Sequence, residues 1–325
     1  MKLRCAVVGH GGIGKVHARI AAKYGELCAV CDVDPGKLES FEPSIRYTDY
    51  KTMLDEVRPD VVHICTPHYL HADMVVEALG RGINVLCEKP LCIKREDIDR
   101  ILEAERQSGA MLGVCMQNRY NAANLFVKEH LEGKKVDNAS GTVFWHRDAA
   151  YYASGEWRGK WETEGGGVLI NQAIHTLDLS RYFMNSEVSD VKATATHFGT
   201  TTIEVEDTAN GMITFENGGK LIFYFTITSV KDHKISVTLD CENGTAELLA
   251  NVAKITYNDG TVEASQNINE YIALGKECYG TGHYKQIDEF YSENNEEKVR
   301  ATMYEAYKTQ KLLDDIYDTA GLIRK

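Results

Sequence analysis

The chain has 325 residues, of which 43% are hydrophobic and 26% charged, a balance typical of a globular protein large enough for two domains. Its 36 Lys and Arg residues are outnumbered by 48 Asp and Glu residues, which gives a formal net charge of -12. A surface of this sign repels phosphate backbones and anionic lipid, so we expect neither a nucleic-acid nor a membrane partner.

The N-terminal region carries no signal for export or membrane insertion. The apolar run at residues 5–8 is too short for a signal-peptide core, and no stretch reaches the roughly 18 apolar residues of a membrane span. We therefore expect a cytoplasmic location. The nine cysteines are scattered. Cys28 and Cys31 form a Cys-x-x-Cys pair, but residues three apart on a strand face opposite ways, so we expect free thiols and no metal site.

The first third of the chain alternates short apolar strands with helices. We expect strands at residues 3–8, 28–31, 61–65, 84–87 and 111–115, and helices at 12–24, 50–57, 69–79 and 95–108. Such alternation indicates a parallel sheet covered by helices on both faces. The predicted fold class is α/β, with a doubly wound Rossmann domain over residues 1–119 as the dinucleotide-binding part.

After residue 120 the strands and helices no longer alternate. The new pattern predicts an α+β domain over residues 120–325 with a largely antiparallel open sheet. We expect a strand at 136–147, a helix at 168–183, successive strands from 190 to 262, and two final helices that could pack back on the first domain. The pairs Asn217-Gly218, Asn243-Gly244 and Asp259-Gly260 predict hairpin turns, because these residues accept positive φ.

The strand at residues 221–228 alternates two kinds of face. Leu221 and Phe223 share the face expected in the core, while Ile222 and Tyr224 share the other. Exposure of that second face to water would be unfavourable, because the face is largely apolar. We therefore expect a homo-oligomer, a dimer or tetramer, assembled through the C-terminal sheet.

A glycine-rich turn follows the first strand and opens the first helix. Its Gly-x-Gly-x-x-Gly pattern predicts a dinucleotide site: one glycine allows the tight turn, the second lets amides approach the diphosphate, and the third lets helix and strand pack closely. Asp32, at the end of the second strand, would accept hydrogen bonds from the adenosine ribose and repel a 2′-phosphate, so NAD is favoured as cofactor. The expected contacts are Gly9, Gly11, Gly12, Ile13, Gly14 and Asp32.

Three further motifs follow in the same order as in a known family. They are residues 62–72, residues 82–91 with Glu88-Lys89-Pro90, and residues 165–175, which run from three glycines to Asn171 and His175. Together they resemble the glucose–fructose oxidoreductase / inositol dehydrogenase (Gfo/Idh/MocA) family over nearly the whole chain. The resemblance implies that Lys89 contacts the reacting hydroxyl. It also implies cofactor contacts from Thr66, Pro67, His71, Glu88 and Lys89.

His175 is the expected general base, because a neutral imidazole suits proton removal near pH 7. The residue four positions earlier is commonly Asp in the family but is Asn171 here. An uncharged amide can orient substrate but cannot stabilise an imidazolium as a carboxylate would, so Asn171 is assigned to substrate binding. Asp178 is either a partner of this site or a helix-surface acid.

Further substrate contacts are expected before the glycine run. Tyr151, Trp157 and Arg158 combine flat rings with a hydroxyl-binding cation, a combination that suits a saccharide. An aromatic hinge between domains is the alternative interpretation. Arg119, in the segment that resembles the family's substrate-side linker, is expected to bind sugar hydroxyls or the cofactor.

These residues predict an NAD-dependent oxidoreductase whose partner is a small carbohydrate or cyclitol. The expected reaction is oxidation, or the reverse reduction, of a secondary ring hydroxyl, and the expected position is C3 of a hexopyranoside. One alternative is an NAD-recycling glycoside hydrolase that acts by transient oxidation and elimination. Another is a non-catalytic NAD-binding regulatory protein, against which the presence of both Lys89 and His175 argues.

Overall fold

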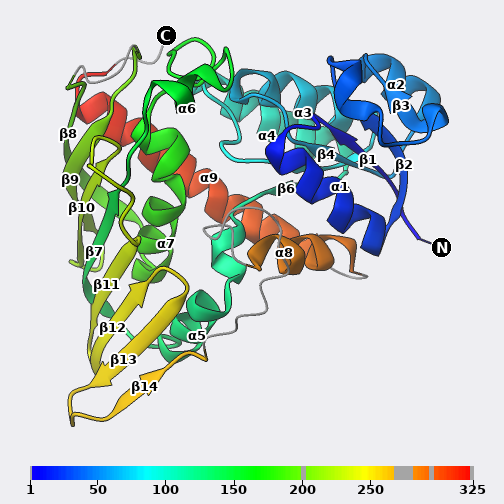
Figure 1. Cartoon of the computed structure of the whole chain (residues 1–325). Helices are drawn as coiled ribbons and strands as arrows, with labels where there is room; N and C mark the ends of the chain where they lie inside the picture. Colours follow the sequence, from blue (N-terminus) through cyan, green and yellow to red (C-terminus); the bar gives the residue numbers. More distant parts are fainter. Residues whose placement is uncertain (1, 199–202, 267–280, 293–295, 323–325) are drawn as a thin grey trace. The chain divides into compact units, whose positions relative to one another are not determined.

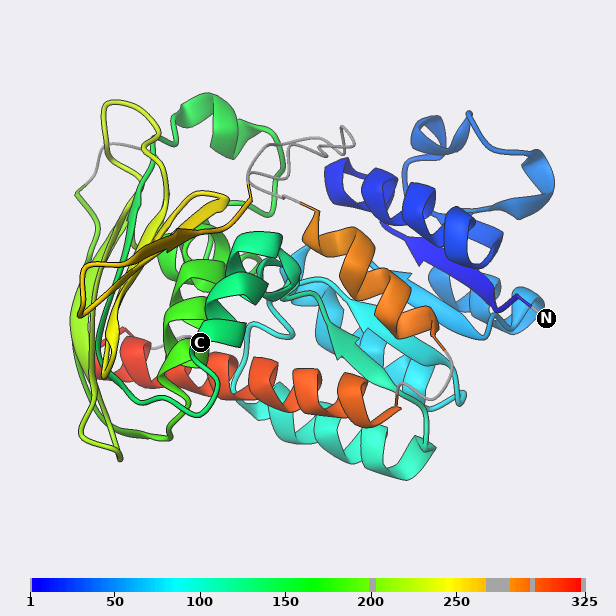
Figure 2. The ribbon, with the colours of Figure 1, turned by 90° about the horizontal axis from the view of Figure 1, so that it is seen from below.

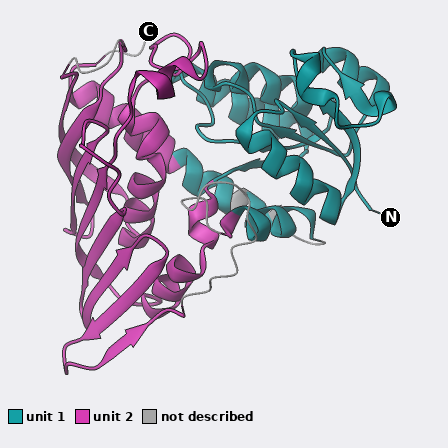
Figure 3. Cartoon of the chain, in the orientation of Figure 1, with its two compact units in different colours: residues 1–115, 273–275, 283–307 teal, residues 116–272, 276–282, 308–325 magenta. Residues whose placement is uncertain are grey.

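A computed structural model describes residues 2–198, 203–266, 281–292 and 296–322 (Figure 1). The chain divides into two compact units (Figure 3). The first contains residues 1–115 and 283–307, and the second contains the rest of the described chain. The long final helix α9, Glu296–Thr319, contributes its first half to one unit and its second half to the other.

A six-stranded parallel sheet forms the centre of the first unit. Its strand order is β3-β2-β1-β4-β5-β6, and every neighbouring pair is parallel. The strands are β1 (Arg4–Val8), β2 (Glu26–Cys31), β3 (Arg46–Tyr47), β4 (Val61–Ile64), β5 (Asn84–Cys87) and β6 (Leu112–Val114). The order reverses between β1 and β4, and this is the switch point at which open α/β sheets bind dinucleotides.

Helices cover both faces of this sheet. They are α1 (Gly12–Tyr24), α2 (Tyr50–Val57), α3 (His71–Leu79), α4 (Glu96–Ser108) and α8 (Gly282–Tyr291). Helix α1 and helix α8, which comes from late in the chain, lie side by side on one face (Figure 2). There Ile20 of α1 packs with Leu86 of β5 and with Ile287 and Phe290 of α8 in one buried cluster. The predicted doubly wound sheet is confirmed.

The second unit contains an eight-stranded, mostly antiparallel sheet. The strands are β7 (Val136–Phe144), β8 (Val188–Thr196), β9 (Thr208–Phe215), β10 (Lys220–Thr226), β11 (Ser236–Cys241), β12 (Gly244–Leu249), β13 (Val252–Tyr257) and β14 (Val262–Ala264). Their order is β14-β13-β12-β11-β7-β10-β9-β8, and β10 pairs with β7 in parallel. Gly218, Gly244 and Gly260 have positive φ at the three hairpins, as their sequence context predicts.

One face of this sheet is covered by α5 (Ala122–His130), α7 (Ile174–Met184) and the second half of α9 (Figure 1). Helix α7 approaches β7 closely: a Cβ on Gly141 would come within 2.7 Å of Ser180 Oγ. On the opposite face Ile222 and Tyr224 are 56% and 40% exposed, although β10 lies in the interior of the sheet. The expected homo-oligomer through this sheet stays a prediction.

One helix differs from its sequence prediction, and two short helices were not predicted. The helix expected at residues 168–183 begins with a π-helical turn, Val168–Gln172, and α7 follows at Ile174. Tyr151 lies in a short helix, α6 (Ala149–Ala153), which is capped by Asp148 and was not predicted. Helix α5 was not predicted either. None of the helices in the described residues has the length and apolar composition needed to cross a membrane.

Candidate active site

The glycine turn after β1 has the geometry that its sequence predicts. Gly9 has φ +84°, and a Cβ there would lie 2.6 Å from the carbonyl oxygen of Cys65. A Cβ on Gly14 would lie 1.8 Å from the carbonyl oxygen of Gly9. Only glycine therefore fits at either position, because any side chain would collide with backbone.

The N-terminus of α1 leaves room for a bound anion. A Cβ on Gly11 or Gly12 would meet no atom within 4 Å, and no side chain caps the helix at Gly11. The backbone amides and the positive end of the helix dipole are thus accessible to a diphosphate. The residues present fit the dinucleotide that the turn predicts.

Asp32 lies at the end of β2 with its carboxylate already oriented. Oδ2 accepts the backbone N–H of His10 at 2.8 Å, and Oδ1 accepts that of Asp34 at 3.0 Å. Lys37 Nζ lies 3.1 Å from Oδ1. Burial alone would raise the pKa of Asp32, but these donors outweigh it and lower the pKa below its ordinary value. Asp32 is therefore an ionised acceptor beside the glycine turn.

His71 connects two of the segments expected to contact the cofactor. Its Nδ1 lies 2.7 Å from the carbonyl oxygen of Pro90, and its Nε2 lies 2.9 Å from that of Thr66. The Lys89–Pro90 bond between them is cis. Burial lowers the pKa of His71 despite its two acceptors. The ring connects the loop after β4 to the Glu-Lys-Pro motif after β5, and its expected contact with the cofactor stays a prediction.

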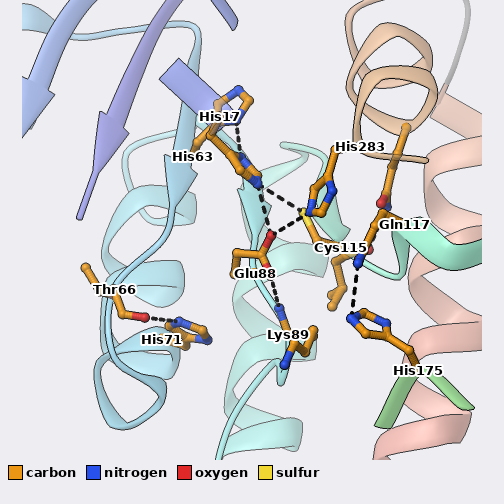
Figure 4. Close-up of polar contacts among 12 residues, drawn as sticks. His17, His63, Thr66, His71, Glu88, Lys89, Cys115, Gln117, His175 and His283 are labelled. Atoms are coloured by element: carbon orange, nitrogen blue, oxygen red, sulfur yellow. Dashed lines mark hydrogen bonds and ion pairs between the residues drawn. The ribbon is translucent and has the colours of Figure 1, made fainter. Parts of the chain in front are cut away.

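Glu88 is the centre of a buried polar network that the sequence did not reveal (Figure 4). Its Oε1 lies 3.0 Å from His17 Nε2 and 3.3 Å from His283 Nε2, and its Oε2 accepts the backbone N–H of Lys89 at 3.2 Å. Burial alone would raise the pKa of Glu88, but the two imidazoles hold it well below its ordinary value. The carboxylate is satisfied by protein donors.

The network continues from His17 toward Tyr291. His17 Nδ1 lies 2.8 Å from His63 Nδ1, and His63 Nε2 lies 2.8 Å from Tyr291 Oη. Burial lowers the pKa values of His63 and His283, so both rings are neutral. When His17 donates from Nε2 to Glu88, its Nδ1 can accept from His63 Nδ1, and His63 Nε2 can then accept the Tyr291 hydroxyl. Each tautomer is fixed by its neighbour.

His17, Glu88 and His283 also place three possible metal-ligand atoms within 4.8 Å of one another. Cys115 Sγ lies 3.9 Å from His17 Nε2. Metal binding would require the imidazole protons on the Glu88 side to leave, because a metal ligates a free nitrogen lone pair. The hydrogen bonds account for this group without an ion, so the expected absence of a metal stays a prediction.

In the second unit the expected base is held by a residue assigned no role from the sequence. His175 is half-buried in the first turn of α7, and its Nε2 lies 3.2 Å from the side-chain nitrogen of Gln117 (Figure 4). Gln117 is buried in the turn before α5. This contact restrains the imidazole ring. Lys89 belongs to the other unit.

Tyr151, Trp157, Arg158 and Asn171 form one cluster in the second unit. The Tyr151 hydroxyl lies 2.7 Å from Arg158 Nη1 and 3.2 Å from Asn171 Nδ2. The Arg158 guanidinium stacks on the rings of Tyr151 and Trp157, with its centre 4.7 and 4.4 Å from the ring centroids. These contacts bring together four residues that the sequence assigned separately to substrate binding, an assignment that stays a prediction.

Glu164 is a site residue that the sequence did not single out. Its fully buried carboxylate accepts hydrogen bonds from Asn171 Nδ2 and from the backbone N–H of Gly159. It lies directly before the glycine run, where an acidic residue looks like ordinary loop surface. Its partners are fixed only by folding.

A cavity of about 540 Å³ opens within the second unit, a size typical of small-molecule sites. Tyr151 and Thr176, which follows His175, are among its lining residues. Arg147 also lines it, pairs with Asp232 at 3.0 Å and stacks on Trp145. Trp157 and Arg158 are not among the lining residues, and Arg158 contacts the lining residue Tyr151.

Arg119 has a different environment from the expected one. It is buried, and its Nε and Nη2 donate to the two carboxylate oxygens of Asp178 at 2.7 and 2.5 Å. Burial alone would raise the pKa of Asp178, but Arg119 holds it below its ordinary value. Asp178 is thus a buried partner and no helix-surface acid. The pair joins the turn before α5 to α7, which favours a structural role for Arg119 over a sugar contact.

The two halves match known families. Residues 3–116 match the GFO/IDH/MocA oxidoreductase family with an NAD-binding Rossmann fold, and residues 135–247 match the GFO/IDH/MocA C-terminal domain. D-glucoside 3-dehydrogenase of Escherichia coli (strain K12) is 30% identical over 243 residues, which are 67% of this chain and 68% of that protein.

Other relatives match over a smaller share of their length. Oxidoreductase YrbE of Bacillus subtilis (strain 168) is 28% identical over 66% of this chain and 64% of its own length. Myo-inositol 2-dehydrogenase of Thermotoga maritima is 26% identical over 59% and 58%. The chain therefore aligns with less than two thirds of either protein.

Two solved structures cover nearly the whole chain. The WlbA dehydrogenase of Bordetella pertussis, in complex with NADH and UDP-GlcNAcA, has a TM-score of 0.81 and 26% identity, and the match covers 99% of this chain and 97% of that one. A levoglucosan dehydrogenase in complex with NADH and levoglucosan has a TM-score of 0.81 at 19% identity, covering 99% and 98%, which shows a shared fold.

Proposed function

Since this chain belongs to the GFO/IDH/MocA family of NAD-binding oxidoreductases, we propose that it is a dehydrogenase acting on a secondary ring hydroxyl of a hexopyranoside, at C3. NAD is the cofactor, held by the glycine turn and by Asp32. The substrate class rests on the cluster around Tyr151. This cluster combines aromatic ring faces with hydroxyl-binding groups, and Tyr151 itself lines the cavity.

The cofactor, when bound, supplies the acceptor for the hydride that leaves the carbinol carbon. His175 accepts the hydroxyl proton, so that the carbon–oxygen bond becomes a ketone while hydride and proton leave separately. Gln117 restrains the imidazole that performs this step. Lys89 contributes positive charge that favours the alkoxide form of the same hydroxyl. The reverse sequence reduces the ketone.

A pyranose matches the groups that the second unit presents. Its C–H face packs on aromatic rings, and its hydroxyls bind amides and cations. Tyr151 Oη lies next to the side-chain amide of Asn171, which is part of the π-helical turn. Two neighbouring hydroxyls of a rigid ring could contact both groups at the same time. A hydroxyl flanked by two others, as at C3, offers such neighbours. The name of the Escherichia coli relative supports the same position.

The deciding experiment combines enzyme and NAD with glucosides, galactosides, inositols and linear polyols. NADH formation is measured, and the new ketone is located by NMR. We expect turnover with pyranosides, a ketone at C3, and one NADH per ketone. Products confined to inositols or polyols would contradict the substrate class, and a ketone at another carbon would contradict the position. Glycoside cleavage without net NADH would instead identify an NAD-recycling hydrolase.

A further inference from the structure

Glu206 is buried two residues before β9 and contacts the start of the π-helical turn that leads to His175. Three successive backbone amides of that turn donate to this one residue. Gly167 N–H donates to Oε2 at 2.9 Å, Val168 N–H to the backbone carbonyl at 3.0 Å, and Leu169 N–H to Oε1 at 3.0 Å. Glu206 thus supplies the acceptors that the start of this helix requires.

Tyr317, from the second half of α9, completes the arrangement. Its hydroxyl donates to Glu206 Oε1 at 2.9 Å. A Cβ on Gly166 would lie 2.1 Å from this hydroxyl, and a Cβ on Gly167 would lie 1.9 Å from the backbone oxygen of Glu206. The two glycines therefore provide the space in which Glu206 and Tyr317 approach the backbone.

The anchored amides belong to the hydrogen-bonded run that carries the expected site residues. Asn171 N–H donates to the carbonyl of Gly167 at 3.1 Å, and Ala173 N–H donates to that of Val168 at 2.8 Å. Helix α7 and His175 follow without a break. Because the run is helical, a rotation or shift at Gly167 would be passed directly to Asn171 and His175.

We propose that Glu206 is a positioning residue for the dehydrogenase reaction: with Tyr317 it fixes the start of the π-helical turn and so the direction in which Asn171 and His175 point. This inference rests on the proposed function. Its structural basis is a carboxylate whose two oxygens accept three donors at once. An amide has only one acceptor oxygen, so glutamine cannot replace the arrangement.

The burial of this carboxylate is energetically unfavourable unless its hydrogen bonds compensate. Among the described residues no Lys or Arg forms an ion pair with Glu206, and burial raises its pKa to about 7. A neutral cap such as Ser or Thr would satisfy a helix start at lower cost. Glu206 is thus a poor choice for stability alone, and the geometry it imposes on the turn supplies the reason for it.

The test compares Glu206→Gln and Tyr317→Phe with Asp207→Asn as the matched control. Asp207 is the adjacent buried carboxylate, and it accepts the backbone N–H of Phe198 and no amide of the π-helical turn. We expect Glu206→Gln to lower kcat roughly 10- to 100-fold, the range for a small displacement of a catalytic group, with the Kd for NADH unchanged. Tyr317→Phe should have a smaller effect in the same direction, and Asp207→Asn should leave kcat near wild type.

A second readout does not depend on the reaction. The ring resonances of His175, assigned in the wild type by comparison with His175→Ala, should shift in Glu206→Gln and Tyr317→Phe and stay in place in Asp207→Asn. Unchanged resonances with unchanged kcat would overturn the proposal, as would equal losses in Asp207→Asn. Should the wild type lack activity on every sugar, the proposed function would fail while the resonances still test the positioning. Tyr317→Phe, which keeps the carboxylate, serves if Glu206→Gln does not fold.

Discussion

Asn171 donates a hydrogen bond from its side-chain nitrogen to the buried carboxylate of Glu164. The same nitrogen lies 3.2 Å from the Tyr151 hydroxyl, so the nitrogen end of the amide faces protein groups. A carboxylate could not be placed four residues before His175 in this setting without facing Glu164 at close range, and this explains why the position carries an amide.

The first prediction concerns this pair. Asn171→Ala should raise KM more than it lowers kcat, because it removes a contact present in both ground and transition states. Glu164→Gln should act in the same direction, because the amide of Asn171 loses its fixed orientation. Steady-state kinetics with the best pyranoside decide it. A collapse of kcat at constant KM would show instead that Asn171 acts in the transition state.

The second prediction concerns the two residues expected to act on the chemical step. Lys89→Ala and His175→Ala should each lower kcat by roughly 10²–10⁴, the usual contribution of a positioned acid–base group. The Kd for NADH, measured by fluorescence titration, should stay near wild type in His175→Ala, which removes no expected cofactor contact. Gln117→Ala should give a smaller loss, because it frees the ring without removing it. Near-normal turnover in His175→Ala would remove its assignment as base.

The third prediction is cofactor preference. Asp32 would repel the 2′-phosphate of NADPH, so NADH should bind at least about 10-fold tighter, or about 1.4 kcal/mol. Lys37 partly neutralises Asp32. Asp32→Ala should therefore narrow the preference and Lys37→Ala should widen it. Asp34→Ala is the matched control, because Asp34 accepts from Gly36 within its own turn. Tighter NADPH binding by the wild type would contradict the assignment of Asp32.

The fourth prediction is a pH dependence of stability. The folded-state pKa of Glu206 is raised to about 7, chiefly by burial. Glu206 binds its proton more tightly in the folded protein than in the unfolded one. Its contribution to the stability of the folded state is therefore complete below the unfolded pKa of about 4.3 and is lost as the pH rises through 7. The difference in Tm between Glu206→Gln and wild type should therefore shift in favour of the variant between pH 5 and pH 8, by the equivalent of about 1–3 kcal/mol in the free energy of unfolding. A constant difference would show that Glu206 does not titrate in this range.

Other titratable groups around Glu206 do not reproduce this effect. Tyr317 and Tyr152 have pKa values raised far above the range tested, and both stay neutral.

The fifth prediction is that the protein needs no metal. Dialysis against a chelator should leave kcat and Tm unchanged, and elemental analysis should find well below one zinc per chain. If the protein does bind a metal, the expected ligands are His17, Glu88 and His283. Stoichiometric metal in the wild type, lost in Glu88→Gln together with activity, would assign a metal centre to these three residues.

The features that the sequence determines are those encoded locally. The glycine turn, the strand–helix alternation and the hairpin glycines depend on φ preferences and on side-chain periodicity over a few residues. They are sufficient to predict the parallel sheet, the antiparallel sheet and the position of Asp32. The motifs around Lys89 and His175 extend this to an expected chemistry through resemblance to the family.

Only the tertiary structure decides which buried groups meet. Glu88 pairs with His283, which lies 195 positions away, and Glu206 receives a hydrogen bond from Tyr317, which lies 111 positions away. No local pattern marks such partners, because they come together only when separate strands and helices pack. The same reason explains Arg119, which looked available in the sequence but is held by Asp178. Burial makes each of these pairings necessary, because a charged or polar group removed from water must find its partner within the fold.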